Sequence, residues 1–239
     1  MDHKLDELVQ KLKYAAGQDL RAIVLYGSAV TGEFHSKHSN LNMLCLIERT
    51  SAVVLDALRP VVFWWIRQGH PAPLIFTLDE LRRSADVFAI ELLDMKAHHR
   101  MLFGEDFFPE LSVPLQYHRA QVERELRTGW LRLRQAIVVS PKKAKVLLGL
   151  MVSSVSSFAA LFRHALLALG EPPAATKREA IDQAARLAGS DPRGFQTILD
   201  LREGKRKANT INVEQTLGLY FALVEAVTNE VDRRLDAKS

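Results

Sequence analysis

Residues 24–47 constrain the fold of this chain more than any other stretch. The apolar run at residues 21–26 predicts a buried strand, and Gly27 and Ser28 follow it as a turn into a short helix. A polar loop then leads to a second predicted strand over residues 41–47. A glycine and a small hydroxyl residue between strand and helix present free backbone N–H groups to an anion, so Gly27 and Ser28 are candidate phosphate-binding residues.

Two asparagines stand at the entrance of the second predicted strand. Ser39 and Asn40 precede the strand, and Asn42 is its second residue. Side chains alternate along a strand, so Asn40 and Asn42 share one face and point toward whatever Gly27 and Ser28 hold. The alternative is that both asparagines only satisfy backbone groups at the strand entrance and bind nothing.

The rest of the first half predicts helices between short strands. Apolar residues recur at helical spacing over residues 5–16, 52–68 and 84–95, with Pro60 as a candidate for a kink or break. A third short strand is expected over residues 74–77. This alternation predicts an α+β class for the first half, with a small mixed sheet flanked by helices.

The third predicted strand leads directly into a helix start. Thr77 and Glu80 have the spacing of a capping box, in which each side chain binds the backbone N–H of the other residue. A segment over residues 100–103, closed by a turn at residues 104–106, ends this half.

The second half predicts an all-helical bundle with short connections. Helical patterns cover residues 116–139, 144–169, 176–187, 193–202 and 213–235. The helix over residues 144–169 is apolar almost all round, which is typical of a central bundle helix or an oligomer interface. We therefore expect two domains, residues 1–110 and residues 111–239.

The Gly-Ser turn and the asparagine strand resemble the signature of the nucleotidyltransferase superfamily. That signature is Gly-Ser, a spacer that contains a glycine, and then Ser-Asp-x-Asp leading an apolar strand; residues 25–32 and 39–47 match its spacing. The superfamily includes DNA polymerase β, kanamycin nucleotidyltransferase and the minimal nucleotidyltransferases. The resemblance covers residues 20–108, and the helical half is similar to the bundle that follows the catalytic domain in antibiotic nucleotidyltransferases.

The resemblance implies a nucleotide-binding site formed by Gly27, Ser28, Ser39, Asn40 and Asn42. In the superfamily two paired aspartates and a third acid on a nearby strand hold two divalent metal ions. Here Asn40 and Asn42 occupy the paired positions, and an asparagine offers a metal one neutral oxygen without charge. The third acid is expected on residues 74–77, which contain none. We therefore predict no catalytic residue and no metal ligand in this chain.

Three functions remain open from the sequence. The leading hypothesis is a bacterial-type pseudoenzyme that has lost metal-dependent transfer and acts by binding a nucleotide, such as ATP with Mg²⁺, or a partner. The missing third acid favours natural degeneration over an engineered pair of asparagines. The second hypothesis is an active transferase that adenylylates a small-molecule or protein hydroxyl with relocated acids such as Glu33, Asp79 or Glu91. The third is an interaction or dimerisation module built on residues 144–169.

Composition indicates where the protein is located and which partners are not expected. Cys45 is the single cysteine, so neither an internal disulfide nor a cysteine-based zinc site is expected, and a cytoplasmic location follows. The charged N-terminus has no signal core, and no apolar run reaches the about 18 residues of a membrane span, so no membrane partner is expected. The net charge of +4 is too small to indicate nucleic-acid binding.

Overall fold

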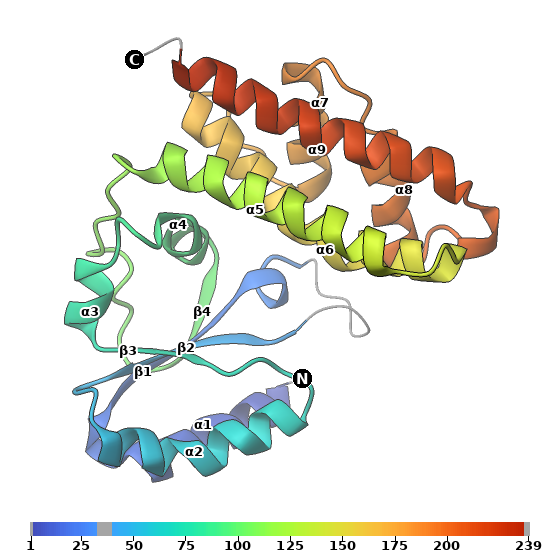
Figure 1. Ribbon diagram of the computed structural model, residues 1–239. Coiled ribbons are helices and arrows are strands. Elements are labelled where there is room, and N and C mark those ends of the chain that lie inside the picture. The colour runs from blue at the N-terminus through green and yellow to red at the C-terminus, as the bar shows by residue number, and fades with distance from the viewer. Residues whose placement is uncertain (1, 33–39, 237–239) are drawn as a thin grey trace. The chain divides into compact units, whose positions relative to one another are not determined.

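The computed structural model describes residues 2–32 and 40–236 and divides into two compact units (Figure 1). The first unit is Met1–Leu115 and the second is Gln116–Ser239. The first unit contains the sheet, and the second is helical. The expected α+β class, a mixed sheet flanked by helices and followed by a helical region, is confirmed.

The first unit is built on a four-stranded mixed sheet in the order β3-β2-β1-β4. Its strands are β1 (Leu20–Tyr26), β2 (Asn42–Ile47), β3 (Leu74–Phe76) and β4 (His99–Phe103). The central strand β1 runs antiparallel to both β2 and β4, whereas β3 is parallel to β2. Residues 100–103 had no definite structure assigned from the sequence pattern. They form most of β4, the edge strand next to β1.

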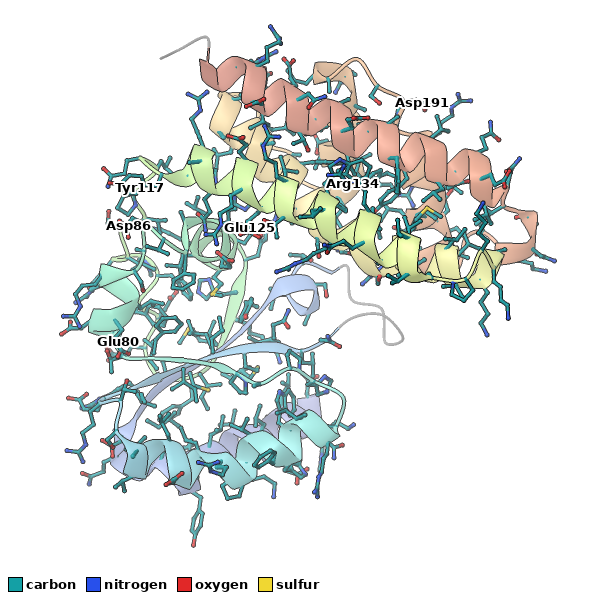
Figure 2. The ribbon with its side chains drawn as sticks, viewed as in Figure 1. Glu80, Asp86, Tyr117, Glu125, Arg134 and Asp191 are labelled. Atoms are coloured by element: carbon teal, nitrogen blue, oxygen red, sulfur yellow. The ribbon has the colours of Figure 1, made fainter. Side chains whose placement is uncertain are left out.

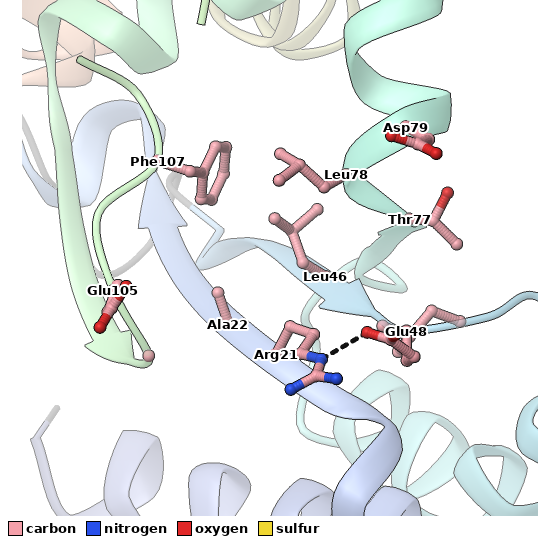
Figure 3. A pocket seen from close by; sticks show the side chains of 11 residues that line it. Arg21, Ala22, Leu46, Glu48, Thr77, Leu78, Asp79, Glu105 and Phe107 are labelled. Carbon is pink, nitrogen blue, oxygen red and sulfur yellow. Dashed lines mark hydrogen bonds and ion pairs between the residues drawn. The ribbon is translucent and has the colours of Figure 1, made fainter. Parts of the chain in front are cut away.

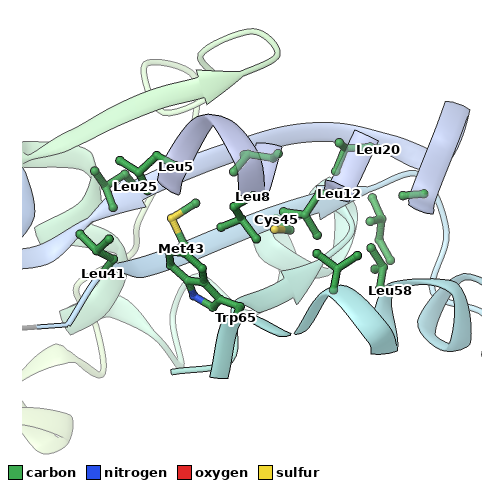
Figure 4. Close-up of a cluster of buried hydrophobic side chains, with 14 of the residues drawn as sticks. Leu5, Leu8, Leu12, Leu20, Leu25, Leu41, Met43, Cys45, Leu58 and Trp65 are labelled. Carbon is green, nitrogen blue, oxygen red and sulfur yellow. The ribbon is translucent and has the colours of Figure 1, made fainter. Parts of the chain in front are cut away.

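One face of the sheet packs against two long helices, α1 (Asp2–Ala16) and α2 (Ala52–Arg67). The inward side chains of α1 follow one another at helical spacing, and Trp65 of α2 is fully buried among them (Figure 4). Pro60 lies within α2, which continues through it without a break.

The opposite face packs against two short helices, α3 (Leu78–Arg83) and α4 (Ala89–Ala97). The capping box is confirmed: Thr77 Oγ1 accepts from the N–H of Glu80, and the Glu80 carboxylate accepts from the N–H of Thr77, at the start of α3 (Figure 2). The sequence pattern predicted one helix over residues 84–95, but the observed helix α4 begins only at Ala89. The Ser84 hydroxyl donates to the Glu80 carbonyl at the end of α3, and the chain turns before α4 begins.

The second unit packs its helices around α6 (Ala144–Leu169), which contacts each of the four others. Those are α5 (His118–Val139), α7 (Lys177–Leu187), α8 (Arg193–Arg202) and α9 (Val213–Asp236). Its core is aromatic: the rings of Phe195 and Tyr220 stack with centroids 3.8 Å apart, and Phe158 and Phe162 pack against Phe195. By length and composition α6 is apolar enough to cross a membrane, yet here it is the core helix of the bundle.

Gly104, directly after β4, is the glycine whose replacement we expect to damage the first unit most. Its φ is +82°, and an added Cβ would overlap the carbonyl oxygen of Arg21 on β1. Gly69 is a matched control, since its φ is +88° and an added Cβ there meets nothing within 4 Å. We expect Gly69→Ala to cost about 1 kcal/mol, from backbone strain alone, and Gly104→Ala to cost about 3 kcal/mol.

Tryptophan fluorescence in a Trp130→Phe background reports this unfolding, because the two remaining tryptophans, Trp64 and Trp65, lie in the first unit. The free energy of unfolding is taken from urea titrations of both variants. Equal losses for Gly104→Ala and Gly69→Ala would contradict the close approach of Gly104 to β1.

Candidate functional site

Three side chains form a row across one edge of the sheet. Asn42, the first residue of β2, pairs with Tyr26, the last residue of β1, and Tyr26 pairs on its other side with His99, the first residue of β4. Paired residues of antiparallel strands point to the same face, so all three side chains share a face. Asn42 and Leu44 are two residues apart on β2, so their side chains point to the same face of the sheet. Leu44 belongs to the core under α3 and α4, so the row lies on the face that these helices cover.

The Gly-Ser turn continues directly from this row. Gly27 to Ala29 form a single 3₁₀ turn, in which the Val30 N–H donates to the Gly27 carbonyl at 3.0 Å. Gly27 has φ +79°, and a Cβ added to it would lie 2.9 Å from Nδ2 of Asn42. The structure therefore brings Gly27, Ser28 and Asn42 together, with the Asn42 amide against the turn.

The other two predicted site residues are less closely engaged. Asn40 lies just before β2 and is exposed. By alternation it falls on the same face as Asn42. Ser39 lies outside the residues that the structure describes, as does Glu33.

Tyr26 is a part of this edge that the sequence did not assign to the site, and Glu91, one of the relocated acids considered from sequence, acts on it through its charge. Burial and, to a smaller extent, the charge of Glu91 on α4 raise the pKa of Tyr26 to about 12. The Tyr26 phenol is therefore a neutral hydroxyl at physiological pH, with a carboxylate in its electrostatic field. No local sequence signal reveals this grouping, because it depends on how β1 pairs and where α4 lies.

His99 closes the row on β4 and is held in place by two polar contacts and one ring contact. Its Nδ1 lies 2.8 Å from the Met95 carbonyl, its Nε2 lies 3.2 Å from Oδ2 of Asp106, and its ring packs on Phe108 at a centroid distance of 4.3 Å. Both ring nitrogens are thus engaged, so His99 borders the edge as a fixed polar surface.

Asp79, one of the relocated acids considered from sequence, lies at the opposite end of the sheet. Because β3 is parallel to β2, the residues after β3 follow the carboxyl end of β2, whereas Asn42 is at its amino end. Asp79 lines a separate pocket of about 640 Å³ there, together with Glu105 and the ion pair of Arg21 with Glu48 (Figure 3). An acid at residue 77 would likewise be remote from Asn42, so the end of β3 was the wrong place to look for a third acid.

The residues at this edge do not fit a two-metal centre. Within residues 2–32 and 40–236 no group of three or more His, Cys, Asp or Glu side chains is arranged to hold a metal ion. Asn40 and Asn42 are neutral, and the carboxylates that reach the row are Glu91, whose charge acts on Tyr26, and Asp106, which is engaged with His99. Two divalent ions beside a triphosphate require several carboxylates, and the described residues of this edge supply too little negative charge for them.

Comparison with known proteins identifies the architecture. One solved structure that the chain resembles is spectinomycin adenyltransferase AAD(9) from Enterococcus faecialis with ATP and spectinomycin, at a TM-score of 0.56 and 13% identity, over 96% of this chain and 99% of that one. The fold is nucleotidyltransferase-like. At this identity the likeness concerns the fold alone. No protein-family model and no curated protein matches the sequence.

The raised pKa of Tyr26 predicts an alkaline loss of stability. The folded-state pKa lies above the usual 10, so the folded protein holds the phenolic proton more tightly than the unfolded chain does. This stabilisation is complete below pH 10 and is lost as the pH rises through about 12.

We expect the decline in unfolding free energy between these pH values to be smaller in Tyr26→Phe, which has no phenolic proton. Parallel urea titrations of both proteins measure it, and the difference cancels the titration of Cys45, whose pKa burial also raises. Identical pH profiles would show that Tyr26 is not buried as described.

Proposed function

We propose that this protein binds a nucleoside triphosphate at the Gly27–Ser28 turn and does not carry out two-metal nucleotidyl transfer. The observation that carries the proposal is the Asn42 amide beside Gly27, with Nδ2 only 2.9 Å from where a Cβ on Gly27 would lie. A phosphate seated on the turn N–H groups would lie next to this amide.

The charge of residue 42 determines whether a metal ion is required between this residue and the phosphate. An aspartate there would repel the triphosphate unless a metal ion lay between the two anions. The Asn42 amide instead brings two N–H donors and no charge, so it can hydrogen-bond a phosphate oxygen directly. Binding by Gly27, Ser28, Asn40 and Asn42 therefore requires no protein-bound Mg²⁺, although Mg²⁺ can accompany the nucleotide as its counterion.

ATP is the first ligand to test, because the similar adenyltransferase structure is described with ATP. Bound nucleotide would make the protein a sensor or a nucleotide-dependent partner protein. The single cysteine, buried in β2, fits the reducing cytoplasm in which such a role is expected.

Calorimetric titration with ATP tests the proposal. The dissociation constant in EDTA is expected to lie within about threefold of that in Mg²⁺, since no protein-bound cation bridges the contact. Asn42→Leu removes a hydrogen bond to a charged group and should weaken binding by about 10- to 100-fold. Asn229→Leu, at an exposed position on α9, is the control and should bind ATP as the wild type does.

Failure of folded wild-type protein to bind millimolar ATP would refute nucleotide binding and leave a scaffold role. Binding that disappears in EDTA would instead show that the chain recruits a metal ion, which contradicts direct recognition of the phosphate by the Asn42 amide.

A second candidate is an active nucleotidyltransferase with a rebuilt site. Glu91 favours it, because among Glu91 and Asp79 it is the acid whose charge reaches the Asn42–Tyr26 edge. Incubation of the protein with labelled ATP, divalent metals and a cell extract tests it. Transfer of label that is lost in Glu91→Gln would establish this function, and no transfer with any metal would exclude it.

A further inference from the structure

The end of the second unit where α5 passes into α6 exposes apolar side chains to solvent. Val138 and Val139, the last two residues of α5, are 83% and 82% exposed, and Leu131 two turns earlier is 50% exposed. Neighbouring exposed valines at a helix end have no role in the core of the bundle. We call residues 138–145 the α5–α6 corner.

The α5–α6 corner and the last turns of α5 before it gather unpaired positive charge. Arg132, Lys142, Lys143 and Lys145 are all exposed, and none makes an ion pair with any residue in the described part of the chain. The surrounding sequence offers no counter-charge, because residues 126–170 contain no aspartate or glutamate although the whole chain has 28.

The position of the three lysines is unfavourable for the stability of the helix. Lys143 is the N-cap of α6, where no side chain caps the backbone and the first turn contains no acid. Cations at the positive end of a helix dipole oppose it. The lysines and the free N–H groups at the start of α6 thus both make the electrostatic potential at this helix end more positive.

The loop between α8 and α9 lies at the same end of the bundle (Figure 1). Arg202, at the end of α8, donates to the Val152 carbonyl of α6, which fixes this arrangement. The loop adds the basic residues Lys205, Arg206 and Lys207. Of the acids nearby, Glu203 is already paired with Lys205 and Arg178, and Glu214 lies in the first turn of α9. The end of the bundle therefore remains positive.

We propose that the α5–α6 corner binds the surface of an anionic lipid bilayer. Val138 and Val139 enter the boundary between headgroups and acyl chains, while Lys142, Lys143 and Lys145 contact lipid phosphates. The contact is peripheral, so α6 stays in the bundle core and no segment spans the membrane. It departs from the expectation, drawn from the sequence, that the protein has no membrane partner.

The shape of the corner selects a bilayer over other anions. It is a protruding helix end, as the exposure of both valines shows, and a deformable lipid surface can surround such an end. A single nucleic-acid strand would need exposed aromatic rings to stack its bases. Trp130, the tryptophan of α5, is instead packed edge-on against Phe221 and covered by the Arg134 guanidinium.

Vesicle sedimentation with the full chain tests this proposal. Wild-type protein is expected to sediment with phosphatidylcholine vesicles that contain phosphatidylglycerol, not with pure phosphatidylcholine, and less as salt is added. Each cation near a charged surface contributes about fivefold to partitioning, so the triple variant Lys142→Gln, Lys143→Gln, Lys145→Gln should lose about 100-fold. Val138→Ser with Val139→Ser should weaken binding to the same vesicles.

A matched control removes three lysines from the first unit: Lys4→Gln, Lys11→Gln and Lys13→Gln. It changes the net charge equally and should leave most vesicle binding intact. Circular dichroism confirms that each variant is folded. Equal losses in the two triple variants, no binding of wild type to anionic vesicles, or binding to a single-stranded oligonucleotide in place of vesicles would each overturn the proposal.

Discussion

The pairing of β1 with strands on both sides is the interaction on which the first unit depends. Its apolar residues alternate between the two cores, with Ile23 and Leu25 under α1 and α2 and with Ala22 and Val24 on the opposite face. Because β1 is fixed on every side, its last residue, Tyr26, holds Asn42 and His99 in one row. The Gly27 turn then leaves the sheet at a defined place, with the Asn42 amide against it.

The described residues of this edge carry little of the negative charge that two-metal nucleotidyl transfer requires. A nucleotidyl transfer by two metals needs carboxylates to hold ions against a triphosphate. This edge presents two amides, a neutral phenol and an imidazole engaged with Asp106, and Glu91 acts on the phenol through its charge. Such a set can donate hydrogen bonds to phosphate, and it does not concentrate metal ions. This contrast is the basis for our proposal of triphosphate binding without two-metal transfer.

The sequence predicted most of the elements because their signals are local. Helical spacing placed α6 and α8 at their observed bounds, and the Thr77–Glu80 capping box was confirmed. The start of α4 was predicted too early, at residue 84, since side-chain bonding by Ser84 competes with helical periodicity. The row of Asn42, Tyr26 and His99 could not be predicted, because it depends on strand pairing between residues far apart in the chain. Strand pairing likewise places the end of β3 at the opposite end of the sheet from Asn42.

Restoring the charges that the superfamily carries tests the central claim most directly. In the double variant Asn40→Asp, Asn42→Asp, two carboxylates would again face the Gly27 turn, and ATP affinity should become dependent on Mg²⁺. We predict that the variant binds ATP at least about 10-fold more weakly in EDTA than in Mg²⁺, whereas the two dissociation constants of the wild type differ by no more than about threefold. Equal Mg²⁺ dependence in the two proteins would contradict the claim that the asparagines replace the metal contact.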